Sequence, residues 1–196
     1  MARVSDALVD AIKLTLDYGI DTHARRIFLH GDLESREDPN ESYVEKVTKS
    51  LLLLDKTDGP IELWINSPGG MMSEMFGIYD IITTRKNHII TIGFGEIASA
   101  AGLILACGDE RKSTENAMFM AHESSSILEG PKSLVDDQIA VWERVNKKWA
   151  ELMARHTKHD AKWWTAKWKN KRETWFNSEE MLEHGLVDSI IPRHTT

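Results

Sequence analysis

The sequence lacks the features that mark disulfide-stabilised and membrane-spanning proteins. Its 196 residues include one cysteine, Cys107, so an internal disulfide is excluded. No apolar run approaches the roughly 20 residues that a membrane-spanning helix needs. The N-terminus does not show a pure apolar core followed by a small-residue cleavage site, so it is a poor signal peptide. We therefore expect a cytoplasmic protein with no membrane partner.

A surplus of basic charge is also missing. The chain has 24 Lys and Arg against 31 Asp and Glu, a formal net charge of −7, whereas a nucleic-acid binder usually carries a basic footprint. Residues 158–172 are locally basic and aromatic. This stretch is explained either by a nucleic-acid patch or by a solvated helix face. The overall charge favours the second explanation, so we expect no nucleic-acid partner.

Ligand-binding motifs of the common kinds are absent as well. The chain contains no HExxH or CxxC spacing that would suggest a metal site. It also contains no GxGxxG or GxxxxGKS loop that would cradle a nucleotide phosphate. We therefore predict neither a metal nor a cofactor.

What the chain does have is the alternating pattern of an α/β fold. Hydrophobic residues make up 41% of the chain and charged residues 28%, which is typical of a folded domain. Short apolar segments predict strands at 25–33, 61–66, 88–94 and 116–122, and periodic segments predict helices at 43–56, 71–85 and 100–108, the last capped by Gly108. Strands that alternate with helices indicate a parallel sheet with right-handed crossovers.

The remaining segments indicate contacts beyond this core. Residues 4–17 have the apolar spacing of an amphipathic helix that docks on a neighbour. Residues 133–156 predict a helix on the order of 35 Å long, which is too long to cover a small sheet. We expect this helix to project and to bury its apolar stripe on another subunit. Residues 177–191 predict a capped helix, stopped by Gly185, and a last strand.

Tryptophan is unusually frequent, with seven residues in all. Five lie close together in the sequence, between positions 142 and 168. They are explained either by packing between helices or by a protein–protein contact surface, where aromatic residues are enriched.

Three short motifs carry the chemistry. Ser99, in GEIASAAG, stands at a strand-to-helix junction, where it is either an ordinary helix cap or a nucleophile beside free N–H groups. His122 ends a predicted strand, at the kind of edge where α/β sites form, although a structural histidine is the default. The turn SPGG carries Gly69 and Gly70, whose N–H groups suit an oxyanion, a peptide backbone or simply a turn. A hydroxyl, an imidazole and backbone N–H groups, together with a carboxylate, are the ingredients of serine acyl transfer.

Taken in order, these motifs resemble the ClpP peptidase family. The resemblance runs from about Arg26 to about Ile191 and is carried by INSPGG (65–70), GEIASAAGLILACG (95–108), ENAMFMAH (115–122), LMARHT (152–157) and NSEEMLEHGLVDSI (177–190). It implies a repeated βαβ spiral core of the ClpP/crotonase kind with a long projecting handle helix. It divides the chain into a divergent N-terminal segment, 1–24, and a peptidase domain, 25–196, whose handle region covers about 123–156.

The resemblance also implies an activity and a set of site residues. The family consists of serine endopeptidases that form two stacked seven-membered rings around a chamber and receive unfolded polypeptides from AAA+ unfoldases. The unfoldase uses ATP, and the peptidase chain needs no cofactor. Carried over by position, the nucleophile is Ser99 and the general base is His122. The oxyanion donors are then Gly70 and Ala100, and the substrate-binding residues are Gly69, Glu123, Ser124 and Ser125.

The chain departs from the family's pattern at several positions. The third catalytic residue of the family is an aspartate, and counting back from GLVD places Glu173 there. Glu96 and Ala100 replace the glutamine and methionine that usually surround the serine. The segment after the histidine has only one glycine, Gly130, and the N-terminal 24 residues lack the family's usual loop and helix. Two other functions therefore stay open: a ring subunit with little or no activity, and a crotonase-type acyl-CoA enzyme, which shares the fold.

Overall fold

The computed structural model describes residues 6–34, 42–125, 127–169 and 173–193. Within these ranges the helices are α1 (Asp6–Tyr18), α2 (Tyr43–Leu54), α3 (Met72–Thr84), α4 (Ala100–Ala106), α5 (Lys132–His156), α6 (Ala161–Lys169) and α7 (Ser178–Glu183). The strands are β1 (Ile20–Asp21), β2 (Arg26–His30), β3 (Ile61–Ser67), β4 (Ile89–Ala98), β5 (Glu110–Thr114), β6 (Met118–Ala121), β7 (Thr174–Phe176) and β8 (Ser189–Ile191). The predicted strands and helices of the core are therefore confirmed, with small shifts of their ends.

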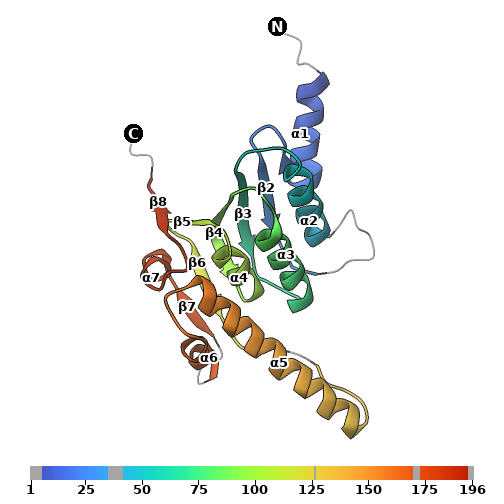
Figure 1. Cartoon of the computed structure of the whole chain (residues 1–196), viewed down its shortest axis with the longest axis vertical. Helices are drawn as coiled ribbons and strands as arrows, with labels where there is room; N and C mark the ends of the chain where they lie inside the picture. Colours follow the sequence, from blue (N-terminus) through green and yellow to red (C-terminus); the bar gives the residue numbers. More distant parts are fainter. Residues whose placement is uncertain (1–5, 35–41, 126, 170–172, 194–196) are drawn as a thin grey trace.

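The strands form one sheet in the order β1-β2-β3-β4-β5-β8, with β6 paired to β4 and β7 paired to β6 (Figure 1). The pairs β2–β3, β3–β4, β4–β5, β4–β6 and β5–β8 are parallel, while β1–β2 and β6–β7 are antiparallel. The predicted α/β class with a mostly parallel sheet is confirmed.

The long strand β4 divides the sheet and positions the site. Its residues 90–93 pair with β5, and its residues 96–98 pair with β6. The register with β3 shifts between Ile65 and Ser67, so β4 continues past the end of β3's regular pairing. Because β4 ends at Ala98 and α4 begins at Ala100, Ser99 is the single residue between them.

The core lies between the sheet and the helices that pack against it. Strand β3 alternates buried and half-buried residues, as expected for a strand in such a sheet. The fully buried apolar side chains of this core include Ile61, Leu63 and Ile65 of β3 together with Ile78, Ile82, Leu103 and Leu105 of the helices. Burial of these side chains is the main force that holds the site's supporting elements in place.

Helix α5 projects from this core, as the sequence predicts. Figure 1 shows it extending away from the sheet, with its N-terminal end farthest from the other elements. Near its C-terminal end, Trp149, Ala150, Leu152 and Met153 are buried, whereas Leu134, Ile139 and Val141 near the other end are exposed. The helix is thus confirmed, and its pairing with another subunit stays a prediction.

The tryptophans of the C-terminal region pack between helices. The Trp149 ring lies 5.8 Å from that of Trp164 and 5.1 Å from that of Trp168, measured between centroids. All three side chains are buried, Trp164 completely. On α6 the lysines Lys162 and Lys169 are exposed. The helix-packing explanation is therefore confirmed for these three tryptophans. The described part of 158–172 has the expected solvated face, while 170–172 lie outside the described residues.

Two features of the central region were predicted incorrectly or missed. Helix α4 ends at Ala106 with Cys107 as its C-cap, and Gly108 does not take the left-handed conformation of a helix stop. A Cβ atom at Gly108 would lie 2.5 Å from Oγ1 of Thr91, so this glycine permits close contact with β4. Strands β5 and β7 were not expected, because β5 reads Glu-Arg-Lys-Ser-Thr and β7 has only three residues.

The predicted helices near the two ends of the chain, α1 and α7, are present in the structure. Asn177 caps α7 in a reciprocal capping box with Glu180, and Gly185 follows the helix with a φ of +74°. Helix α1 lies within the predicted range 4–17 apart from its last residue, Tyr18. The first two residues of the predicted helix, Val4 and Ser5, lie outside the described residues. In the described ranges, no helix combines the length and apolar character needed to cross a membrane.

Candidate active site

The side chains of Ser99 and His122 meet at the carboxyl ends of β4 and β6. Nε2 of His122 lies 2.8 Å from Oγ of Ser99, and this is the only hydrogen bond that the described residues give to the histidine ring. The backbone N–H of Ser99 donates to the carbonyl oxygen of Met120 at 2.7 Å, which ties the serine to β6. The parallel pairing of β4 with β6 therefore brings the two predicted residues together, although 23 positions separate them in sequence.

The backbone of Ser99 is strained. Its φ is +55° and its ψ is −121°, a conformation that a residue with a Cβ atom rarely adopts. Although Ser99 occupies the N-cap position of α4, its side chain makes no capping hydrogen bond. The helix-cap explanation of this hydroxyl is therefore wrong. Strain of this kind gathers at functional sites, where the surrounding structure enforces it.

The glycines of the SPGG turn lie against the same junction. Gly69 has a φ of +90°, and a Cβ atom there would lie 2.6 Å from the carbonyl oxygen of Ala98 and 2.9 Å from the nitrogen of Ala100. Gly70 has a φ of +147°, and a Cβ atom there would lie 2.5 Å from the carbonyl oxygen of Leu33. Only glycine permits this close approach of three backbone segments.

Two backbone N–H groups are available beside the serine. Ala100 is the first residue of α4, so its N–H has no acceptor within the helix. The neighbouring N–H groups of Gly69 and Met71 are used, donating to Oγ of Ser67 and to the carbonyl oxygen of Leu33. For Gly70, the hydrogen bonds of the described residues include no acceptor of its N–H. Gly70 and Ala100 thus have the free donors that an oxyanion requires.

A cleft of about 400 Å³ opens onto these groups. Its walls include three of the predicted catalytic and oxyanion residues, Gly70, Ser99 and His122, and two of the predicted substrate-binding residues, Ser124 and Ser125. The remaining lining residues are Glu34, Pro68, Met71 and Met72. The predicted residues Gly69, Ala100, Glu123 and Glu173 are not part of the lining.

Glu173 lies beside His122 in the strand register but is not hydrogen-bonded to it. In the antiparallel pair β6–β7, Ala121 is opposite Thr174, so one further step along both chains places Glu173 opposite His122. The side chain of Glu173 is exposed, and its Oε2 accepts a hydrogen bond from Nε1 of Trp175 at 3.2 Å. Within the described residues, no hydrogen bond joins Glu173 to His122. The catalytic role of Glu173 therefore stays a prediction.

The thiol of Cys107 does not compete as a nucleophile. It is buried at the C-terminal end of α4, and burial raises its pKa to about 12. Because the thiolate is the reactive form, a thiol that stays protonated at neutral pH is inert.

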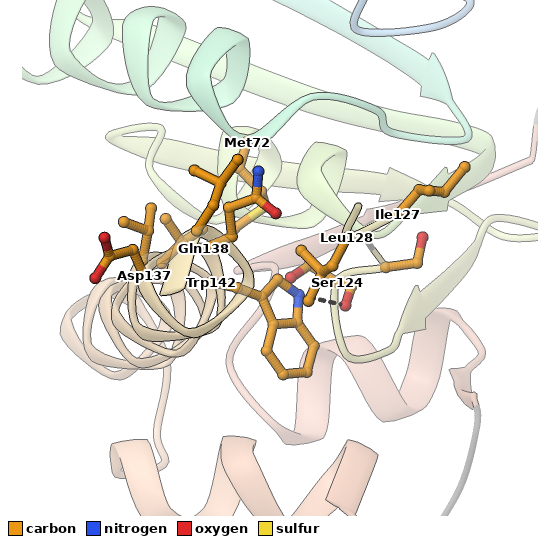
Figure 2. Close-up of a pocket in the computed structure, with 11 residues that line it drawn as sticks. Met72, Ser124, Ile127, Leu128, Asp137, Gln138 and Trp142 are labelled. Atoms are coloured by element: carbon orange, nitrogen blue, oxygen red, sulfur yellow. Dashed lines mark hydrogen bonds between the residues drawn. The ribbon is translucent and has the colours of Figure 1, made fainter. Parts of the chain in front are cut away.

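A second, larger cavity of about 550 Å³ shares Met72, Ser124 and Ser125 with the catalytic cleft (Figure 2). Its other walls are mostly apolar residues of α5 and of the segment before it, namely Ile127, Leu128, Leu134, Asp137, Gln138, Val141, Trp142 and Val145. Sequence reasoning did not single out the contacts of Trp142 or Asn146 with Ser124, which join this wall to the cleft.

Known proteins whose sequences are similar to this chain belong to one family. The family model described as Clp protease matches residues 19–194. An ATP-dependent Clp protease proteolytic subunit 2 of Treponema denticola is 32% identical over 172 residues, covering 86% of this chain and 82% of that protein. A subunit 3 of Streptomyces avermitilis is 34% identical over 156 residues, covering 78% and 70%. A subunit 2 of Pseudomonas aeruginosa is 31% identical over 174 residues, covering 85% and 81%.

Proposed function

The chain belongs to the Clp protease family, and from that premise we propose that it is a serine endopeptidase with Ser99 as its nucleophile. The observation that carries the proposal is the 2.8 Å contact between Oγ of Ser99 and Nε2 of His122, at the wall of an open cleft. A serine hydroxyl is a weak nucleophile unless a base removes its proton, and a hydrogen-bonded imidazole is the base that most often does so.

The reaction follows from the positions of these groups. His122 accepts the proton of Ser99 as Oγ attacks the carbonyl carbon of a peptide bond. The N–H groups of Gly70 and Ala100 then stabilise the negative charge on the carbonyl oxygen. In many such enzymes this stabilisation of the transition state is the largest single contribution to the rate acceleration. The protonated His122 gives its proton to the leaving amine, and water releases the acyl group from Ser99 by the same steps in reverse order.

We propose Glu173 as the carboxylate that orients the histidine. The register of β6 and β7 supports this assignment, because residues opposite each other in an antiparallel pair have their side chains on the same face. A rotation of the Glu173 side chain away from Trp175 would turn the carboxylate toward His122. Glutamate has one methylene more than the aspartate that the family usually has, which gives it a longer reach.

We further propose that the substrates are unfolded polypeptides and that the chain acts within an oligomer. The printed names of the relatives describe proteolytic subunits of an ATP-dependent protease. The exposed apolar residues of the projecting helix, Leu134, Ile139 and Val141, support burial against further copies, as in two stacked seven-membered rings. ATP would then be used by a partner AAA+ unfoldase, and this chain would need no cofactor.

One observation favours a second function, that of a ring subunit with little activity of its own. The carboxylate of Glu173 accepts a hydrogen bond from Trp175, so in this conformation none of the described residues orients the histidine by a hydrogen bond to its second ring nitrogen. A crotonase-type acyl-CoA enzyme is less well supported, since such enzymes need no serine–histidine pair.

The proposal is tested with the Ser99→Ala variant of the whole chain. We expect the wild-type protein to hydrolyse fluorogenic peptides, and we expect Ser99→Ala to abolish hydrolysis while leaving the mass of the oligomer unchanged in light scattering. Unchanged turnover in the variant would overturn the assignment. An inactive wild-type protein that still assembles would support the second function.

A further inference from the structure

We propose that Trp142 and Asn146 are positioning residues that hold segment 123–125 in the conformation that pairs with the substrate backbone. The inference deepens the proposed peptidase function and rests on it. The hydrogen bonds of the described residues join neither residue to Ser99 or His122, so both would act through Ser124. We call the three residues Ser124, Trp142 and Asn146 the clamp.

The clamp uses every hydrogen-bonding group of Ser124. Nε1 of Trp142 donates to the carbonyl oxygen of Ser124 at 2.8 Å, which Figure 2 shows as a dashed line. Oδ1 of Asn146 accepts from the backbone N–H of Ser124 at 3.2 Å and from its Oγ at 2.8 Å. Trp142 and Asn146 are four positions apart on α5, so they lie on one face of the helix. The helix thus fixes Ser124 on both sides of its Cα atom.

The clamp determines which backbone groups are open to a ligand. In an extended chain, the N–H and C=O groups of successive residues point to opposite edges. Because the groups of Ser124 face α5, those of Ser125 would point away from the helix in an extended segment. Ser125 lines the catalytic cleft, and the hydrogen bonds of the described residues do not include its backbone. A peptide in the cleft could therefore add to this edge as a further strand.

The segment needs such support because it belongs to no strand. Strand β6 ends at Ala121, and among the described residues the next element is α5. A chain of this kind without fixed partners loses conformational entropy when a substrate orders it, and pre-ordering removes that cost. In the side-chain amide of Asn146, only the oxygen is used. Its Oδ1 accepts two hydrogen bonds from Ser124, whereas its Nδ2 is buried without a hydrogen-bond partner. The clamp therefore requires a hydrogen-bond acceptor at this position and no donor.

The test compares Trp142→Phe and Asn146→Leu, which remove the clamp's donor and acceptor, with Asn146→Asp, which keeps the acceptor. Lys148→Leu, on an exposed position of the same helix, is the matched control. For each protein, kcat and KM are measured with an extended fluorogenic peptide and with a small activated ester. The ester transfers its acyl group to the serine and releases its alcohol, and it needs no strand partner for this reaction. Peptide affinity is measured separately by fluorescence anisotropy in the Ser99→Ala background.

We expect the first two variants to raise the peptide KM by about 2- to 10-fold, the range that one hydrogen bond accounts for, and to weaken peptide binding equally. The ratio of peptide to ester turnover should fall, and Asn146→Asp should restore most of it. Equal losses of ester and peptide turnover, or unchanged KM and binding, would overturn the clamp. A wild-type protein that binds peptide but does not hydrolyse it would refute the peptidase function alone, since the binding measurement still tests the clamp.

Discussion

Oε2 of Glu173 accepts a hydrogen bond from Nε1 of Trp175 at 3.2 Å, although the strand register places Glu173 opposite His122. The carboxylate therefore has two competing partners on the same face of the β6–β7 pair. With the tryptophan as its partner, it does not orient the imidazole, whose hydrogen bond among the described residues is the one to Ser99. With the histidine as its partner, it would complete the arrangement of nucleophile, base and acid that serine acyl transfer uses. Which of the two partners the carboxylate takes therefore decides between an active peptidase and a ring subunit with little activity.

Removing the competing donor should favour the active arrangement. In Trp175→Phe the ring remains and the N–H is lost, so we expect kcat for peptides to rise by about 2- to 10-fold, the range of one hydrogen bond. Glu173→Gln should lower kcat by at least about 10²-fold, because the amide cannot stabilise the imidazolium. In the double variant the Trp175→Phe gain should disappear. If neither single change alters kcat, Glu173 has no catalytic role.

The oxyanion donors can be tested through glycine geometry. Gly70→Ala places a Cβ atom 2.5 Å from the carbonyl oxygen of Leu33 at a φ of +147°, so the N–H of residue 70 must move. We expect kcat/KM to fall by about 10²- to 10³-fold, which is the usual cost of losing an oxyanion donor. The control is Gly77→Ala in α3, where an added Cβ atom meets nothing within 4 Å.

The control variant has its own expected result. Gly77→Ala should keep wild-type activity and raise the free energy of unfolding by about 0.5–1 kcal/mol, because alanine is the better helix former. Thermal unfolding of both variants, followed by circular dichroism, separates loss of activity from loss of fold. A Gly70→Ala protein that is folded and fully active would show that the oxyanion is bound elsewhere.

A pH dependence of stability follows from His156 at the end of α5. Its ring lies 3.0 Å from Oη of Tyr79, and burial, followed by the charges of Arg111 and Arg155, lowers its pKa below the ordinary 6.5. Between the lowered and the ordinary pKa the unfolded chain binds the extra proton, so stability rises with pH across that window. We expect the free energy of unfolding to fall as the pH drops from 7 through 6.

The His156→Gln variant identifies the group responsible. It removes the titrating ring, so its free energy of unfolding in urea should change less between pH 7 and pH 5 than that of the wild-type protein. His159, whose pKa is lowered by burial, His184 and Lys167, contributes in the same direction and accounts for part of any remaining slope. Equal slopes in the two proteins would exclude His156 as the cause.

Much of the fold could be predicted from the sequence, because its core elements have distinct local signals. The apolar runs around Ile61–Ser67 and Ile89–Ala98, and the periodic stretch that became α5, each have one dominant pattern. Strand β5 has no such signal. Its residues Glu110, Arg111 and Lys112 are charged, and its place in the sheet depends on pairing with β4 and β8. Such pairing is a tertiary effect that overrides local preference.

In the candidate site, too, some features could be predicted from the sequence and others depend on the tertiary structure. The resemblance of the ordered motifs SPGG, Ser99 and His122 to one family named the residues that meet in the cleft, and the parallel pairing of β4 with β6 is what brings Ser99 and His122 together. The choice of Glu173 between Trp175 and His122 is a matter of side-chain rotamers, which sequence spacing does not encode. The clamp was missed for a similar reason, since Trp142 was assigned to a group of tryptophans and Asn146 had no motif around it.

Reaction of the protein with a fluorophosphonate probe tests the central claim most directly, because the probe modifies only a serine that a base has activated. Mass spectrometry of the digested protein identifies the modified residue. We predict one adduct per chain, on Ser99, with labelling slowed at least about 10²-fold in His122→Gln. An intact, folded protein that shows no adduct at Ser99, or that labels equally fast without the histidine, would contradict the account.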